Sequence, residues 1–93
     1  MNARVAGLLA CLDAHQTEDP TEAAYLRQVK ALLTDTPKPL IREQYTPGHV
    51  TASSYVLDEE LRRVLLIYHS KLHRWLQPGG HVESTDVDIE AAA

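Results

Sequence analysis

The chain has little of what would place it in a membrane, in a disulfide-stabilised scaffold or on nucleic acid. Its single cysteine, Cys11, cannot form an internal disulfide, which favours the reducing cytoplasm. No apolar run approaches the roughly 18 residues that a membrane span needs, so no membrane partner is expected. The formal charge is −4, so no global positive field attracts DNA or RNA.

What the chain does contain is ordinary globular material. Its 93 residues suffice for one small domain, and 44% apolar with 24% charged residues argues against disorder. The first twelve residues superficially resemble a short signal peptide. Asp13, His15 and the helical spacing of the apolar residues favour an amphipathic helix instead.

Two antiparallel helices are predicted within residues 1–45, which we interpret as an N-terminal helical extension and linker. The first has one apolar face, formed by Val5, Leu8, Leu9 and Leu12. Asp19 is a good N-cap for the second, with Pro20 at its first position and Glu22 placed for a capping box. Its apolar face comprises Ala23, Leu26, Val29 and Leu33. Pro37 and Pro39 prevent its continuation.

Strand-like residues follow in residues 46–93, which we treat as the second part of the chain. Residues 49–57 are rich in β-branched and aromatic side chains, and residues 64–68 form a continuous apolar run. Such a run suits a central strand covered on both faces. With the polar turn at residues 58–60, the pattern predicts a hairpin that joins a sheet flanked by helices.

A glycine pair lies near the end of the chain, in the stretch Trp75–Asp86. Gly79 and Gly80 allow a sharp turn and close approach of the backbone to a ligand. Val82 is expected in a short strand after the turn. Asp86 or Thr85 is a suitable N-cap for a final helix.

Residues 79–93, in this context, resemble the front half of a Nudix box. That motif reads Gly, five residues, Glu, seven residues, then Arg-Glu and later Glu-Glu. Gly80 takes the first position, Asp86 stands where Glu is usual, and residues 87–93 fill the spacer. The preceding strands and the Trp-Leu-Gln-Pro prelude are also similar to one bacterial Nudix subgroup. The resemblance covers residues 49–93.

The resemblance implies an α/β fold, specifically an α/β/α Nudix sandwich with a mixed sheet. Only its N-terminal part would lie in this chain. It further implies a hydrolase that cleaves a diphosphate linkage in a nucleotide-like small molecule with Mg²⁺ or Mn²⁺. Hard cations of this kind prefer oxygen ligands.

Site residues are carried over position by position. The backbone carbonyl of Gly79 matches the family's metal ligand, while Gly80, Glu83 and Asp86 form the motif loop. Loop carboxylates of this kind usually support a turn or cap a helix rather than perform chemistry. Asp86 keeps the carboxylate but has a shorter reach than Glu. The motif glutamates would follow Ala93, so we expect the 93-residue chain to be inactive alone and to self-associate through exposed strand edges.

Basic residues and histidines supply further candidates with open alternatives. Lys71, His73 and Arg74 would contact substrate phosphate or form a solvated basic loop. His69 and His73 have i, i+4 spacing, but no third ligand supports zinc. His69 and His81 flank a cleft or sit on the surface. His49 and Tyr55 face a substrate base or are packing residues. Cys11 is expected to be a small hydrophobe rather than a nucleophile.

Two other functions remain open from the sequence. The chain would be a non-catalytic Nudix-like nucleotide-binding or interaction module if a stop codon followed Ala93. Alternatively it would be a small α+β domain whose glycine pair is only a turn. Residues encoded after Ala93 distinguish an enzyme from a binding module.

Overall fold

Three helices and four short strands form the fold in a computed structural model that describes residues 2–93. The general class expected from the sequence, a mixture of α-helices and β-strands, is confirmed. No helix within the described residues has both the length and the apolar character needed to cross a membrane. In chain order the elements are α1 (Ala3–Ala14), α2 (Pro20–Asp35), β1 (Thr51–Ser53), β2 (Ile67–His69), β3 (Arg74–Leu76), β4 (Gly79–His81) and α3 (Ile89–Ala92).

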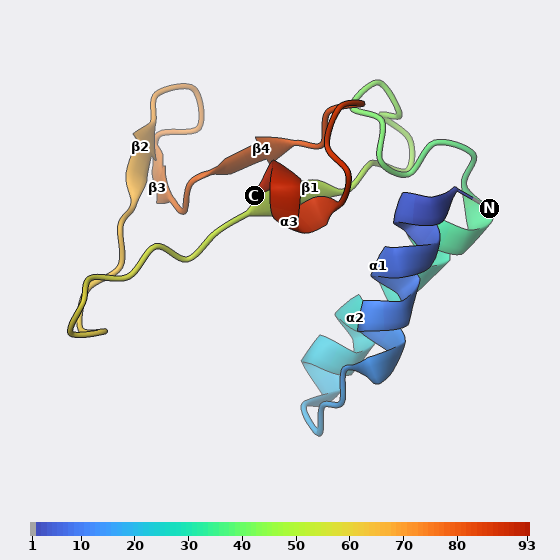
Figure 1. The fold of residues 1–93 in the computed structure, drawn as a ribbon, viewed down its shortest axis with the longest axis horizontal. Coiled ribbons are helices and arrows are strands. Elements are labelled where there is room, and N and C mark those ends of the chain that lie inside the picture. The colour runs from blue at the N-terminus through green and yellow to red at the C-terminus, as the bar shows by residue number, and fades with distance from the viewer. Residues whose placement is uncertain (1) are drawn as a thin grey trace.

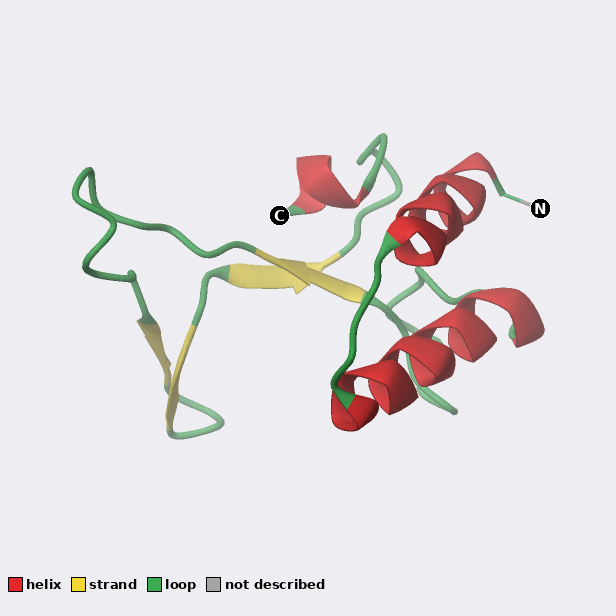
Figure 2. Cartoon of the chain, turned by 90° about the horizontal axis from the view of Figure 1, so that it is seen from below, coloured by secondary structure: helices red, strands yellow, loops and turns green. Residues whose placement is uncertain are grey.

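The predicted helical hairpin is present, with α1 and α2 packed side by side (Figures 1 and 2). Asn2 caps α1 by accepting the Arg4 backbone N–H at 2.8 Å. Asp19 caps α2 by accepting the Thr21 N–H at 2.9 Å. These side chains satisfy backbone donors that the first helical turn leaves without partners, which explains why the helices begin where they do.

The capping box expected at the start of α2 is wrong. The backbone N–H of Asp19 donates instead to Thr17 Oγ1 at 3.1 Å, so its donor is satisfied locally. The Glu22 carboxylate contacts the ring of His15, which follows the last turn of α1. A histidine at the end of one helix thus attracts the carboxylate expected to close the box.

A small hydrophobic core joins the helical hairpin to the second part of the chain. Its buried members are Val5 on α1, Leu33 on α2 and Leu40 in the following segment. Partly buried side chains pack against them: Leu8, Leu9, Leu12, Val29, Val50 and Ile89. The division of the chain at residues 45 and 46 stays a prediction, and this core spans it.

One glutamine side chain organises the irregular segment between α2 and β1. Gln44 Oε1 accepts the Lys38 N–H at 2.9 Å. Gln44 Nε2 donates to Thr36 Oγ1 at 3.0 Å and to the Gly48 carbonyl at 2.6 Å. The side-chain amide therefore ties three points of residues 36–48 together and fixes the path by which the chain enters β1.

The strands form two separate antiparallel pairs rather than one sheet. β1 pairs with β4, and β2 pairs with β3. The hairpin expected between residues 49–57 and 62–69 is reduced to one bridge, Leu57 with Val64. That expectation is wrong in its extent, because residues 51–53 pair with Gly79–His81 instead.

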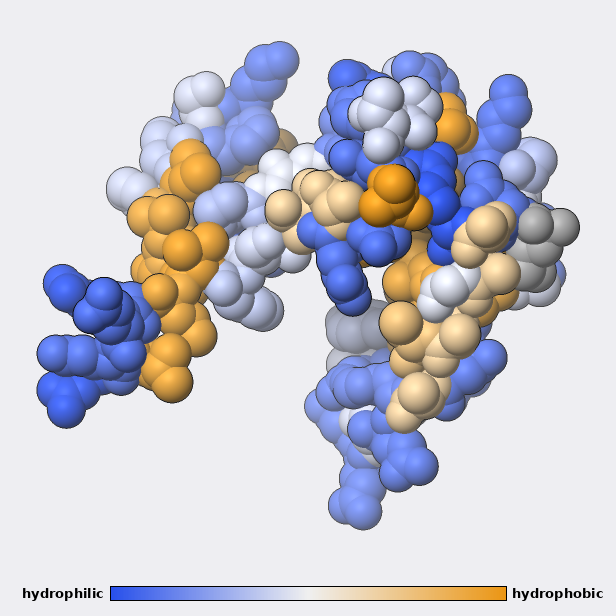
Figure 3. Space-filling model, in the orientation of Figure 1, coloured by the Kyte–Doolittle hydropathy of each residue, from blue (hydrophilic) through white to orange (hydrophobic). Residues whose placement is uncertain are grey.

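Residues 55–75 form an exposed arm that carries β2 and most of β3. Every residue of the arm is exposed except half-buried Asp58. The prediction that residues 64–68 are covered on both faces is wrong for residues 2–93, because Leu65 and Ile67 are 53% and 52% exposed. Figure 3 shows apolar side chains gathered along the arm, on the left of the view. Each strand of this hairpin pairs with only one other strand, and no second layer covers the hairpin within residues 2–93, so its apolar side chains stay exposed.

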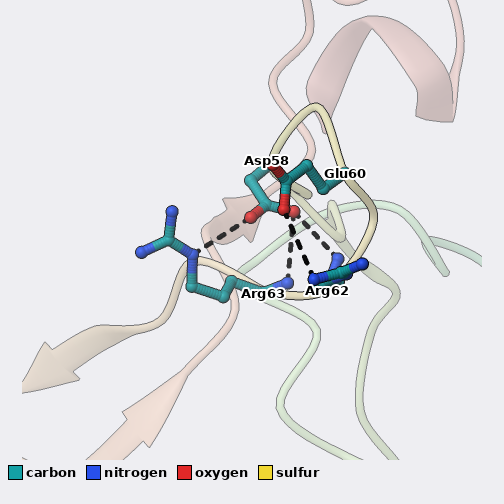
Figure 4. A network of polar contacts seen from close by, with 4 residues as sticks. All are labelled: Asp58, Glu60, Arg62 and Arg63. Atoms are coloured by element: carbon teal, nitrogen blue, oxygen red, sulfur yellow. Dashed lines mark hydrogen bonds and ion pairs between the residues drawn. The ribbon is translucent and has the colours of Figure 1, made fainter.

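The turn at the tip of the arm is held by one carboxylate (Figure 4). Asp58 Oδ1 accepts the backbone N–H groups of Arg62 at 2.9 Å and Arg63 at 3.2 Å. Its Oδ2 accepts from Arg63 Nε at 3.0 Å. The Arg62 N–H, then the Arg63 side chain and N–H, hold the pKa of Asp58 below its ordinary value of 3.8, because each favours the charged form.

This turn should therefore resist acid until the pH is below the ordinary range for aspartate. Because the folded pKa is lowered, the carboxylate contributes stability that is present above pH 3.8 and is lost as the pH falls through the folded value. Carbon-detected NMR titration of Asp58 should give a midpoint below 3.8, with the Arg62 and Arg63 amide signals shifting in parallel. An Asp58→Asn variant should lose this parallel shift; a midpoint at or above 3.8 contradicts the prediction.

Candidate functional site

The candidate site is built on the β1–β4 pair and the loop that leads from β4 to α3. Thr51 lies opposite His81, Ala52 opposite Gly80, and Ser53 opposite Gly79. Ala52 and Val82 are buried, whereas Thr51 and His81 are exposed. Side chains alternate between the two faces of a strand, so one face packs on the interior and the other faces solvent.

Gly79 is required by close approach of the two strands. A Cβ at this position would lie 2.4 Å from the Ala52 carbonyl oxygen and 2.6 Å from Ser53 Cβ. At Gly80 a Cβ would meet nothing within 4 Å. The two neighbouring glycines therefore have different roles: Gly79 permits strand contact, and Gly80 has space for a side chain.

The prediction of a sharp turn at the glycine pair is wrong. Both glycines lie inside β4, and among residues 2–93 the glycine with a positive φ is Gly48, at +148°. Pairing with β1 holds the segment extended, and the hydrogen bond from Ser54 N–H to the Pro78 carbonyl, 2.9 Å, continues the strand contact.

The loop after β4 is closed by Asp86. Asp86 Oδ2 accepts the Glu83 N–H at 2.8 Å, and the Asp86 N–H donates to the Glu83 carbonyl at 3.1 Å. This pair of bonds agrees with a loop-supporting role for Asp86. It also explains a correction: the N-cap of α3 is Asp88, which accepts the Ala91 N–H at 2.8 Å, and not Asp86 or Thr85. The Asp86 carboxylate accepts the Glu83 N–H in the preceding loop and does not cap α3.

Arg4 ties this loop to α1, a contact that sequence reasoning missed. Its Nη1 donates to the Glu83 carbonyl at 2.9 Å and to the Asp86 carbonyl at 3.1 Å. In the sequence, Glu83 and Asp86 follow Arg4 by 79 and 82 positions. Nothing in the local pattern around Arg4 indicates such a distant partner. The charged guanidinium therefore holds the loop against the N-terminal helix.

Replacing Arg4 by alanine should loosen the loop and destabilise the protein by about 1–2 kcal/mol, since two hydrogen bonds from a charged donor are lost. Hydrogen exchange at the Glu83 amide should accelerate, because its acceptor, Asp86, lies in the freed loop. The control is Arg27→Ala on an exposed position of α2. Equal exchange rates at Glu83 in both variants would refute the role of Arg4.

The three basic residues for which phosphate contact and a solvated basic loop were both open lie in the arm. Lys71, His73 and Arg74 belong to the turn and the start of β3 in the arm. Figure 1 places the β2–β3 hairpin beyond one end of the β1–β4 pair and the residue 82–88 loop beyond the other. These cations therefore lie at the end of the β1–β4 pair opposite the loop that contains Glu83 and Asp86. His73 Nδ1 instead lies 3.3 Å from the Tyr68 hydroxyl.

Two histidines that the sequence did not pair do meet at the site. His49 Nε2 lies 3.1 Å from His81 Nδ1, and their ring centroids are 5.2 Å apart. His49 precedes β1 and His81 ends β4, so strand pairing brings them together. Tyr55, 79% exposed, lies on the arm. A cleft beside α1 and the end of α2 is lined by Asn2, Lys38 and Leu40, among others, but not by these histidines or Gly79.

The arrangement as a whole is a braced loop beside a strand pair. The oxygen atoms that it could offer to a metal ion are backbone carbonyls and the Glu83 and Asp86 carboxylates. No group of three or more His, Cys, Asp or Glu side chains within residues 2–93 is arranged to hold a metal ion. No protein-family model, curated protein or solved structure matches the chain.

Proposed function

We propose that residues 46–93 belong to a Nudix-type domain that hydrolyses a diphosphate linkage in a nucleotide or related nucleoside diphosphate derivative. The observation that carries the proposal is the spacing of Gly80, Asp86 and the following helix on a strand–loop–helix unit. β4 ends at His81, the loop is closed at Asp86, and α3 begins at Ile89. The proposed complete fold is the α/β/α sandwich with a mixed sheet.

In this proposal the chain supplies positioning rather than the reacting groups. Gly79 allows β4 to approach β1 closely, which fixes the direction in which the loop leaves the sheet. Arg4 then holds the Glu83 carbonyl, and the Asp86 carboxylate holds the Glu83 N–H. A rigid loop of this kind would orient the helix whose glutamates the motif requires, because catalytic geometry depends on supported elements.

Mg²⁺ or Mn²⁺ is the cofactor that the resemblance implies. The Gly79 carbonyl alone is one oxygen donor, and such cations need about six. Because residues 2–93 hold no cluster of three ligating side chains, this part of the chain does not fit a complete site for either ion. The motif's Arg-Glu and Glu-Glu residues would have to follow Ala93.

Hydrolysis measured on two forms of the chain tests the proposal. The 93-residue chain should release no product from nucleoside diphosphate derivatives with Mg²⁺ above the enzyme-free rate. The same chain continued through its native coding sequence after Ala93 should be active, with a rate enhancement of at least about 10⁶-fold, the lower range for enzymes. A matched control changes the first motif glutamate after Ala93 to glutamine.

Two outcomes would overturn the hydrolase proposal. Hydrolysis by the 93-residue chain at the rate of the longer form would show that the missing glutamates are not needed. A coding sequence without the Arg-Glu and Glu-Glu residues would leave the non-catalytic binding module, which nucleotide binding without turnover would identify.

A further inference from the structure

The pair formed by His49 and His81 has a geometry that goes beyond the proposed hydrolase. The two histidines approach from adjacent segments of the β1–β4 unit, on its solvent side. His81 is exposed and His49 half-buried. The 3.1 Å between His49 Nε2 and His81 Nδ1 suits a hydrogen bond, and it also suits two donors to one metal ion.

The hydrogen-bond partner of His49 determines which nitrogen carries its lone pair. His49 Nδ1 lies 3.2 Å from the Gln44 carbonyl oxygen, which can only accept. Neutral His49 therefore carries its proton on Nδ1, and Nε2 holds the free lone pair that faces His81. Ligating histidines in proteins are oriented in this way, by donating the other ring N–H to a backbone carbonyl.

The carbonyl that orients His49 is itself held in place. The Gln44 side chain makes hydrogen bonds to Lys38, Thr36 and Gly48 across the segment that leads into β1. This network fixes the backbone of residues 44–48, and with it the acceptor for His49 Nδ1. One ligand of the pair is consequently preorganised, while exposed His81 can adjust about its broad χ2 torsion.

The separation of the two nitrogens fits a single ion. Imidazole nitrogens bind zinc at about 2.0–2.1 Å. With both nitrogens at such a distance and 3.1 Å apart, they subtend about 98° at the ion. This angle lies between the 90° of square-planar or octahedral coordination and the 109° of a tetrahedron. Each ring must turn so that its lone pair points at the ion beside the pair rather than at the other ring.

We propose that His49 Nε2 and His81 Nδ1 together bind one divalent transition-metal ion of the zinc class. Imidazole favours zinc, copper and nickel, whereas Mg²⁺ prefers oxygen. Since no third ligating side chain accompanies the pair within residues 2–93, water completes the coordination. The site would fasten the entry to β1 to the end of β4.

Binding requires a change of tautomer at His81 but no net loss of a proton. In the metal-free pair, His81 Nδ1–H donates to the His49 Nε2 lone pair. When the ion binds, Nδ1 becomes a ligand and the ring carries its proton on Nε2, which exchanges with solvent. The proton of His49 stays on Nδ1 and continues to be donated to the Gln44 carbonyl oxygen. The proton count of the two neutral rings is unchanged.

Zinc titration of the 93-residue chain, by calorimetry and by ¹⁵N NMR of the imidazole rings, tests the proposal. One ion should bind per chain, and ring signals of His49 and His81 should shift while those of the other three histidines do not. His49→Asn and His81→Asn should each weaken affinity at least about tenfold, because a lost ligand matters no less than a lost supporting contact. Mg²⁺ should not compete.

Matched controls change histidines that lie outside the His49–His81 pair. His69→Asn removes one member of the i, i+4 pair in the arm, and His15→Asn removes the contact with Glu22. Both should leave zinc affinity unchanged. Far-UV circular dichroism establishes that each variant is folded. Absence of zinc binding, equal weakening by the control variants, or one ion per two chains would overturn the proposal and leave His49 and His81 as a hydrogen-bonded pair.

Discussion

Gly79→Ala should destabilise the protein by about 3 kcal/mol. This is the upper end of the range of about 1–3 kcal/mol that added atoms usually cost in a packed contact. The added methyl would lie 2.4 Å from the Ala52 carbonyl oxygen and 2.6 Å and 2.7 Å from Ser53 Cβ and Cα. None of these atoms is the end of a flexible side chain, so β1 and β4 must move apart. Against a total stability of about 5–15 kcal/mol, the change is large.

Gly80→Ala is the matched control for this substitution. The two positions are adjacent in β4, both are exposed, and both lose the same backbone freedom when a methyl is added. At Gly80 the new Cβ meets nothing within 4 Å. We expect a change within about 0.5 kcal/mol, or a slight stabilisation from the lower entropy of the unfolded chain.

Urea denaturation followed by circular dichroism distinguishes the two variants. The midpoint should fall for Gly79→Ala and remain near the wild-type value for Gly80→Ala, with similar slopes. Zinc binding provides an independent readout, because separation of β1 from β4 should also separate His49 from His81. Equal midpoints for the two variants would show that strand contact at Gly79 is not required for stability.

Local signals in the sequence predicted the helices well. The i, i+3, i+4 pattern from Val5 to Leu12, and Asp19 followed by Pro20, are complete within one or two helical turns. Their physical basis, apolar periodicity and satisfaction of the first N–H groups, does not depend on the rest of the fold. The capping box failed because Glu22 met His15, a partner from the preceding helix.

The strands were predicted less well because their pairing depends on distant segments. The apolar run at residues 64–68 contains no information about which segment of the protein covers it. It predicted a covered central strand, whereas Leu65 and Ile67 remain about half exposed in residues 2–93. Similarly, residues 51–53 looked like part of a local hairpin but pair with Gly79–His81 across the whole length of the arm.

The candidate site shows the same division between local and distant information. Asp86 as a loop-supporting residue followed from its place in a short motif, and its bond to the Glu83 N–H agrees. The contact of Arg4 with Glu83 joins residues 79 positions apart in the sequence, and that of His49 with His81 joins residues 32 positions apart. No periodicity or spacing rule reaches so far, so only the folded arrangement brings these residues together.

The exposed arm should make the 93-residue chain self-associate at micromolar concentrations, the second large effect that we expect. Leu65 and Ile67 are 53% and 52% exposed, and the β2–β3 pair has free edges. Full burial of such a side chain is worth about 1.5–3 kcal/mol, so covering the exposed half contributes about 1 kcal/mol. Unpaired strand edges add hydrogen bonds to the same contact.

Leu65→Lys with Ile67→Lys should therefore weaken association strongly. In a symmetric dimer four side chains change, which removes about 4 kcal/mol and lowers the association constant about 1,000-fold. The control is Val87→Lys, which places a charge at a side chain that is 77% exposed but lies outside the arm. Sedimentation velocity over a range of concentrations should show oligomers for the wild type and the control, and monomers for the double variant. A monodisperse wild-type monomer that melts cooperatively would contradict the prediction and show that the arm is stable without a partner.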